Sequence, residues 1–304
     1  MKATSVAPRN ERERKKVKST TGAGERRSPA PVVDFAFFRS RSFLGATLVA
    51  FTVSFAMLAM FFFLALYMQD ILRYSALEAG VRFLPSTVVI IFTAPIAGRL
   101  ADRIGPKPLM AAGLALASVA LFLQSMLDAS SGYAQLLPAF MIMGLGMGLT
   151  MSPMSTAAMN AVSPDKAGGA SGILSMSRMV GGTFGVAAIG ALFQSLSKNR
   201  LAADLAGSGL SPSQHARIAD ALSSGKGGRA LHGLAPEQAA QAGRAMRDAF
   251  VHALSGSLKL SAGVAAAGVV LVLLFVERGL SGQHAHPAGE AQAAEPTAPV
   301  AEAA

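Results

Sequence analysis

A short run of charged residues, Gly98 to Lys107, lies between two long apolar segments of the sequence. Its charged members are Arg99, Asp102, Arg103 and Lys107. The chemistry open to such a group is ionic, because a carboxylate here can accept hydrogen bonds from a helix N-terminus or pair with a guanidinium. Gly98 and Gly105 bracket the run, and glycine permits the dihedral angles and the close backbone approach of a tight turn. The pattern predicts a charged turn at a membrane surface.

Catalytic chemistry has little support in the sequence. The chain has no cysteine, which excludes disulfides, cysteine-based metal sites and thiol catalysis. Ser171 lies in Gly169-Ala170-Ser171-Gly172, which resembles the Gly-x-Ser-Gly of rhomboid-type intramembrane proteases, and His252 precedes the sixth apolar segment. A nucleophile and its base must lie within hydrogen-bond reach, whereas these two residues are expected about 30 Å apart, on opposite sides of a bilayer. We therefore expect no enzymatic activity, no metal and no cofactor.

Six apolar segments must position the charged residues. They cover about residues 43–67, 81–100, 109–127, 136–159, 173–193 and 258–276. A helix crosses a bilayer in about 17–25 residues, so each segment is long enough to span it. The chain is 52% hydrophobic and 14% charged, whereas soluble domains are about 25% charged. The sequence predicts an all-α, polytopic membrane protein with six transmembrane helices.

The remaining segments are polar. We expect disordered tails at 1–34 and 279–304, a transmembrane domain at 35–278, and a long outer connection with short amphipathic helices at 195–249. Residues 1–41 hold eleven Lys and Arg against four acids, within a formal net charge of +10 for the chain. A basic tail before a first span favours a topology signal and contact with anionic lipid headgroups, and not nucleic-acid binding.

The distribution of cations also predicts the orientation. The basic tail places the N-terminus in the cytoplasm, and six crossings return the C-terminus to the same side of the cell (plasma) membrane. The connection 195–249 disagrees, because it carries seven Lys and Arg on the predicted outer side. The rule weakens for loops near 60 residues, so we keep the cytoplasmic assignment for both termini.

Two polar residues are candidates for intramembrane function. Gln124 lies near the outer end of the third segment, and Arg178 lies inside the fifth, where it either faces a partner or cavity or extends to the interface. Small residues around Gly144 and around Gly181 predict close helix packing, which suits either sliding or static contact. The first segment is rich in Phe and Met, which pack against lipid and neighbouring helices or form an adaptable apolar ligand surface.

The charged turn resembles the signature loop of the major facilitator superfamily, Gly-x-x-x-Asp-Arg-x-Gly-Arg-(Arg/Lys), which joins the second and third helices of a six-helix half. Gly98, Asp102, Arg103, Gly105 and Lys107 match it, and Pro106 replaces a basic residue. The order of features from about Phe35 to Arg278 is also similar to the C-terminal half of fourteen-helix drug:proton antiporters of the EmrB/QacA type. The matching stretches include 63–69, 79–85 and 168–182.

This resemblance implies one half of a major facilitator fold, built from two three-helix repeats. It implies that Asp102 holds a cytoplasmic gate closed, with Arg103 and Lys107 as partners; a positive-inside anchor is the alternative. It also implies efflux of a small amphipathic substrate, with protons as the coupling ion. No Asp or Glu lies in the central part of any span, yet proton antiport needs a titrating group inside the membrane. We therefore expect the chain to need an N-terminal half or a second copy of itself; the alternative is a non-transporting fragment or a regulatory partner of another transporter.

Overall fold

The computed structural model describes residues 35–206, 211, 213–214, 217–218 and 235–276. The expected tails, 1–34 and 279–304, lie outside these residues, as does most of 207–234. The elements are, in order, η1 (Phe35–Arg39), α3 (Arg41–Leu66), η2 (Tyr67–Ile71), α4 (Ala76–Arg82), α5 (Leu84–Ile104), α6 (Pro106–Gln124), α7 (Tyr133–Met159), η3 (Pro164–Lys166), α8 (Ala167–Asp204) and α11 (Pro236–Phe275).

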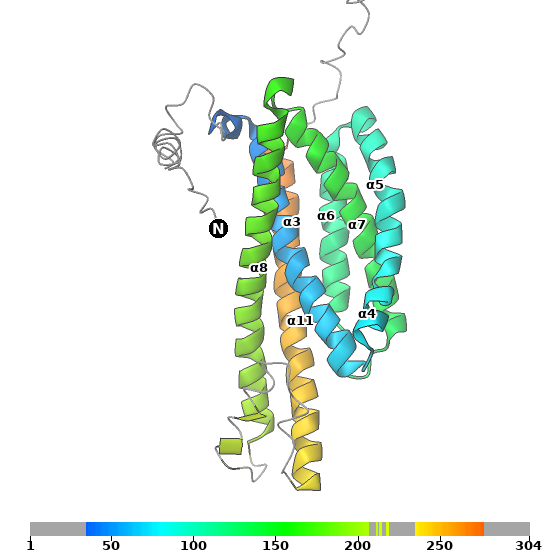
Figure 1. Ribbon diagram of the computed structural model, residues 1–304, viewed down its shortest axis with the longest axis vertical. Coiled ribbons are helices and arrows are strands. Elements are labelled where there is room, and N and C mark those ends of the chain that lie inside the picture. The colour runs from blue at the N-terminus through cyan, green and yellow to red at the C-terminus, as the bar shows by residue number, and fades with distance from the viewer. Residues whose placement is uncertain (1–34, 207–210, 212, 215–216, 219–234, 277–304) are drawn as a thin grey trace, which may run out of the picture.

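Six of the described helical segments are long and apolar enough to cross a membrane. No strand occurs among the described residues, so the expected all-α fold with six transmembrane helices is confirmed. Figure 1 shows the helices running side by side, with α11 beside α8 and passing behind α3, and α5 at the edge. We name the two ends of this bundle by residues that lie there: the Gly105 end, where α5 meets α6, and the Tyr67 end, where α3 finishes.

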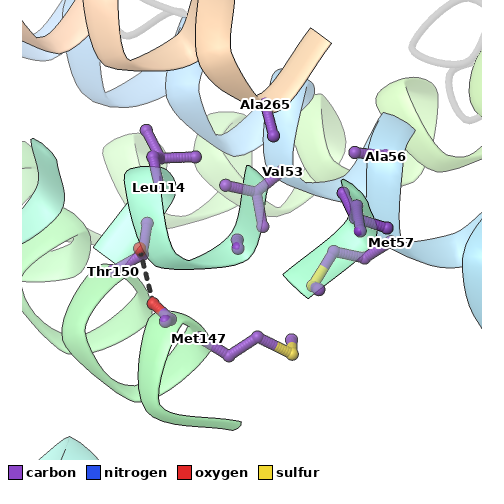
Figure 2. A pocket seen from close by; sticks show the side chains of 10 residues that line it. Val53, Ala56, Met57, Leu114, Met147, Thr150 and Ala265 are labelled. Atoms are coloured by element: carbon purple, nitrogen blue, oxygen red, sulfur yellow. Dashed lines mark hydrogen bonds between the residues drawn. The ribbon is translucent and has the colours of Figure 1, made fainter. Parts of the chain in front are cut away.

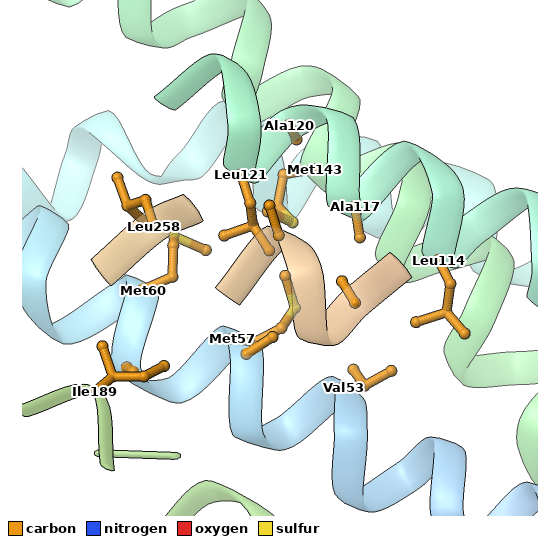
Figure 3. Packing of buried hydrophobic residues seen from close by; sticks show 14 of the residues in the cluster. Val53, Met57, Met60, Leu114, Ala117, Ala120, Leu121, Met143, Ile189 and Leu258 are labelled. Atoms are coloured by element: carbon orange, nitrogen blue, oxygen red, sulfur yellow. The ribbon is translucent and has the colours of Figure 1, made fainter. Parts of the chain in front are cut away.

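The helix α3 is the centre of the bundle, and α5 is its periphery. Fourteen of the 26 residues of α3 are buried, against three of the 21 residues of α5. Burial of α3 follows from its contacts with α8, α11 and α7. Figure 3 shows the packing of its Met57 and Met60 with side chains from α6, α7, α8 and α11. Long, flexible thioether side chains fill irregular gaps between helices, which accounts for methionine at these positions.

Close packing through glycine is present where the sequence predicted it. A Cβ atom at Gly144 on α7 would lie 2.5 Å from the carbonyl oxygen of Ser86 on α5. One at Gly146 would lie 2.7 Å from the carbonyl oxygen of Gly113 on α6. On α8, a Cβ atom at Gly181 or Gly185 would clash with a carbonyl oxygen of α3. These glycines let backbones touch, as small residues do at membrane helix interfaces.

Two helices are much longer than the spans expected for them. Instead of 173–193 and 258–276, α8 has 38 residues and α11 has 40, about 57–60 Å at 1.5 Å per residue. A hydrocarbon core is about 30 Å thick, so both helices project well beyond it at the Tyr67 end (Figure 1). Both ends of the expected connection 195–249 therefore belong to α8 and α11. A separate apolar cluster packs this projection: Leu201, Leu205, Ile218, Ala242, Ala245, Met246 and Ala249.

Candidate functional site

The charged stretch at the Gly105 end is helical and is not an extended turn. Residues up to Ile104 belong to α5, and α6 begins at Pro106, so only Gly105 lies between two helices. Gly105 has φ 84° and ψ 159°, a backbone conformation that glycine adopts without strain. Pro106 suits the first helical position because its missing N–H is not needed there. The prediction of permissive dihedrals is therefore confirmed at Gly105.

Gly98 has a different role from the predicted turn residue. It lies inside α5, where a Cβ atom would lie 2.8 Å from the Ser152 hydroxyl oxygen of α7. The residue therefore provides close approach of α5 to α7, and contributes nothing to the corner itself. The two glycines of the motif thus act on different contacts.

The charged side chains of the motif are not paired with one another. Asp102 and Arg103 are exposed, and neither makes a hydrogen bond or ion pair within the described residues. The Nζ atom of Lys107 donates a hydrogen bond to the carbonyl oxygen of Leu273, at 2.7 Å, in the last turn of α11. The final carbonyls of a helix lack intrahelical donors and carry negative partial charge, so a lysine is favourable there. In this structure Lys107 therefore binds α11, where the resemblance implied Asp102 as its partner.

Lys107 is the first of three links along one line between α6 and α11. The hydroxyl of Ser118 donates to the Ala262 carbonyl oxygen at 2.9 Å. The hydroxyl of Ser255 donates to the Ser125 carbonyl oxygen at 2.6 Å. The bonded residues on α6 are separated by 11 and then 7 positions, and those on α11 by the same numbers in the opposite chain direction, as expected for antiparallel helices. We call these three bonds the α6–α11 seam; it extends over about 27 Å of helix.

Gln124, one of the two intramembrane candidates, is buried at the end of α6. Only 1% of its surface is exposed, and neither its Nε2 nor its Oε1 atom has a hydrogen-bond partner in the described part of the chain. The same holds for the hydroxyls of Ser257 and Ser86. Burying an amide without partners is costly, so Gln124 is a polar group that the packing of the described helices does not satisfy.

Arg178, the other candidate, lies 11 residues after the start of α8 and is half-buried. It makes no hydrogen bond or ion pair with any described residue. Gly181, Gly182 and Gly185 follow it at three, four and seven residues, and each lies against α3. Since residues at these spacings share a helix face, Arg178 lies on the side of α8 that faces α3.

A small cavity lies between four helices (Figure 2). Its volume is about 10 Å³, which is room for about one water-sized sphere. Its lining includes Met57 of α3, Met147 of α7 and Ala265 of α11. The one hydroxyl in it, on Thr150, donates to the Gly146 carbonyl oxygen at 2.8 Å. Ligand pockets are commonly about 300–1,000 Å³, so this apolar space does not hold a drug-sized molecule in this structure. Its side chains, Met57 among them, pack the interior between the helices.

Sequence reasoning missed a polar cluster at the Tyr67 end. The Tyr67 hydroxyl donates to the carbonyl oxygens of Asp128 and Ser131, at 2.8 and 3.0 Å, which ties α3 to the α6–α7 connection. The Arg82 guanidinium lies 3.6 Å from the ring centre of Tyr74. The Tyr133 hydroxyl donates to the Arg82 carbonyl oxygen at 3.0 Å. All three tyrosines of the chain are in this cluster. In the sequence they lie beside the first-to-second and third-to-fourth span connections, and this grouping at one membrane interface could have predicted the cluster.

Asp128 organises the connection that Tyr67 contacts. Its Oδ1 atom accepts hydrogen bonds from the Ser130 hydroxyl and backbone N–H, at 2.7 and 2.8 Å, and from the Ser131 hydroxyl at 3.0 Å. These bonds, those from Ser130 first, hold the pKa of the Asp128 carboxyl below its ordinary value. The charged form is thereby the one that stabilises the connection.

The structure keeps the protease-like residues apart. Ser171 lies near the start of α8, whereas His252 lies on α11 four residues before Gly256. A Cβ atom at Gly256 would lie 2.5 Å from the Leu196 side chain, so His252 is roughly 40 Å along the bundle from Ser171. No group of three potential metal ligands occurs among the described residues.

Comparison with known proteins identifies a family and several similar sequences. Residues 4–186 match the Major Facilitator Superfamily. The chain is 33% identical over 168 residues to the multidrug resistance protein Stp of Mycobacterium tuberculosis, which is 55% of this chain and 31% of the relative. It is 30% identical over 171 residues to the tetracenomycin C resistance and export protein of Streptomyces glaucescens (56% and 32%). It is 33% identical over 192 residues to the puromycin resistance protein pur8 of Streptomyces alboniger (62% and 37%).

The fold has solved counterparts. A crystal structure of a bacterial homologue of the human lysosomal transporter Spinster, inward-facing and occupied, superposes with a TM-score of 0.56 at 18% identity. The match covers 79% of this chain and 50% of the other, so the six helices correspond to half of that transporter. In sequence, the matched stretches span about a third of the curated relatives' length. Since the family match covers more than half of the chain, the protein is a multi-pass membrane protein that belongs to the Major Facilitator Superfamily.

Proposed function

We propose that this chain is one six-helix half of a multidrug efflux transporter, corresponding to the C-terminal half of a fourteen-helix antiporter of the EmrB/QacA type. The observation that carries the proposal is the match to three proteins whose names denote drug or antibiotic resistance. The coverage of half of a solved transporter supports the half-length assignment. The proposed substrate class is small amphipathic molecules, since the first span, α3, is rich in Phe and Met, whose apolar side chains adapt to many shapes.

The half requires a second six-helix unit to transport. In the described spans, acidic residues occur in terminal turns, as Asp70 and Asp102 do, or in the projecting parts of α8 and α11. None is at the middle of the membrane, where a proton-coupling carboxylate is needed. The missing unit is an N-terminal half that supplies such a group, or a second copy of this chain.

The Gly105 end is the cytoplasmic side of the plasma membrane in this proposal. Arg99 and Arg103 lie there, as does Lys107, in accord with the positive-inside rule. Both termini are then cytoplasmic, and α8 and α11 project outward. Asp102 is exposed and makes no hydrogen bond or ion pair within the described residues, so it is available to a cation or helix N-terminus of the other half when the gate closes.

The test is energised efflux of a fluorescent dye from cells that produce this chain alone, or with a matching N-terminal half. We expect no efflux from the chain alone, and efflux that stops with an uncoupler when both halves are present. The Asp102→Asn variant should reduce that efflux, whereas Asp165→Asn, on the exposed turn before α8, should not. A chain shown to be in the membrane that exports nothing, alone or with the N-terminal half, would favour the second candidate function, a regulatory or non-transporting unit. The specific observation behind that alternative is the absence of a mid-membrane acid from the described spans.

A further inference from the structure

A line of polar residues runs along α8 from its first turns to Arg178. Ser171, Ser175 and Arg178 are spaced by four and three residues, so they share one helix face. Both serines are exposed and Arg178 is half-buried. A different face of the same turns carries the exposed, apolar Met176 and Met179. The helix therefore has an apolar face suited to lipid and a separate polar line that ends at a cation.

Contact with α3 fixes the direction in which this polar line points. Gly181 and Gly185 lie so close to α3 that a Cβ atom on either would clash with the carbonyl oxygens of Phe51 and Phe55. Backbone contact of this kind allows little rotation of α8 about its axis. Arg178 precedes these glycines by one and two turns on the same face, so it is held on the side of α8 that faces α3 and away from the methionines.

Arg178 lacks a counter-charge. It is about 16 Å along α8 from Ala167, well inside the span, where a charge is costly unless it is paired or faces a cavity. Within the described residues no carboxylate pairs with it, and the acids of the neighbouring spans lie at helix ends. The side of α8 that faces α3 thus carries a guanidinium with no partner in the described part of the chain.

We infer that Arg178 is a binding site for the anionic group of a small amphipathic molecule. A guanidinium presents paired N–H donors that match a carboxylate, sulfonate or phosphate. This inference rests on the proposed efflux function and narrows its substrate class to molecules that carry a negative charge. The exposed serines extend the polar line toward the end of α8 from which such a ligand enters.

The test is a binding measurement on the purified chain, which does not depend on transport. The chain is placed in phosphatidylcholine nanodiscs and titrated with the fluorescent anion anilinonaphthalene sulfonate, and separately with the cation ethidium. The Arg178→Gln variant should weaken the saturable binding of the anion by about tenfold or more, the loss expected for one charged hydrogen-bonding partner. Arg178→Lys should retain part of it. Lys259→Gln removes an exposed cation from α11 and should change neither titration.

Two results would overturn the inference. One is equal anion affinity in the parent chain and Arg178→Gln, with both variants folded by size-exclusion chromatography. The other is an effect of lipid on the anion titration. If replacing phosphatidylcholine by phosphatidylglycerol abolishes anion binding to the parent chain and leaves that of Arg178→Gln unchanged, Arg178 binds a lipid headgroup. Failure of dye efflux with intact, Arg178-dependent anion binding would reject the proposed function alone. Efflux of cationic dyes with Arg178-independent anion binding would reject this inference alone.

Discussion

The α6–α11 and α3–α8 helix pairs are held together by opposite means. The α6–α11 seam uses Lys107, Ser118 and Ser255, whose side chains each bond a carbonyl oxygen of the other helix. The α3–α8 pair uses glycines and backbone contact, and no hydrogen bond between these two helices is found among the described residues. The first pair has a fixed register, because a shift of one residue would break three bonds together. The second has close contact without directional bonds, so it resists separation and rotation more than axial sliding.

The largest expected effect is on the glycine contact. Gly185→Ala places a Cβ atom against the Phe55 carbonyl, which must push α8 away from α3. Overpacking of this kind typically costs about 1–3 kcal/mol of unfolding free energy. Gly190→Ala on the same helix is the matched control, since nothing lies within 4 Å of its Cβ position. Chemical unfolding in detergent should separate the two variants; equal stability would show that the α3–α8 contact is loose.

The next effect concerns the hydroxyl links of the other pair. Ser118→Ala and Ser255→Ala each remove one interhelical bond, at about 0.6 kcal/mol for an average bond of this kind in a membrane protein. The two sites are two helical turns apart on a common register, so their effects on stability should add. Thr183→Ala is the control, because its hydroxyl bonds only a carbonyl of its own helix. A double variant that loses no more than either single variant would argue against a continuous seam.

The Lys107 link should have a smaller and local effect. Lys107→Gln removes a cation from the C-terminal turn of α11, worth about 0.3–1 kcal/mol at an exposed site. Hydrogen exchange at the Val276 amide, which donates to the Val272 carbonyl in that turn, should become faster. Lys107→Arg should preserve protection. Unchanged exchange in the glutamine variant would mean that the lysine does not stabilise this helix end.

The smallest effect is a pH dependence just beyond the seam's other end. The pKa of Asp128 is lowered in the folded chain, so its contribution to stability is fully present above the ordinary value near 3.9. That contribution is lost as pH falls through the lower, folded value. The protection of the Ser130 amide against hydrogen exchange should therefore be constant above about pH 5 and should fall in acid. Asp128→Asn should already lack this protection at neutral pH.

Sequence reasoning located the helices better than their ends. Apolar composition marks where a chain can enter lipid, and the six spans follow from it. Helix formation continues outside lipid, because residues such as Ala, Gln and Arg favour helix regardless of burial. The start of α11 had a local signal that hydropathy ignores, with Pro236 and Glu237 in its first turn.

The candidate site was predictable only where its cause is local. The role of Gly105 was predictable because the unusual backbone angles of the corner depend on that one residue. The partner of Lys107 lies 166 residues away, and no local pattern identifies which carbonyl it will reach. The direction of Arg178 likewise depends on glycine contacts with another helix. Pairings across the bundle are set by tertiary packing, and they are what the sequence could not show.

The projection of α8 and α11 beyond the bundle has a mechanical consequence. The two helices are continuous from the membrane into the projection, and their apolar cluster holds them together there. The projection is therefore a lever about 27 Å long, the helix length in excess of the hydrocarbon core. A tilt of about 10° within the membrane would move its tip by about 5 Å. Spin or fluorescent labels on Arg200 and Arg244, outside the bilayer, would therefore detect small tilts of α8 and α11 that produce only small displacements inside the membrane.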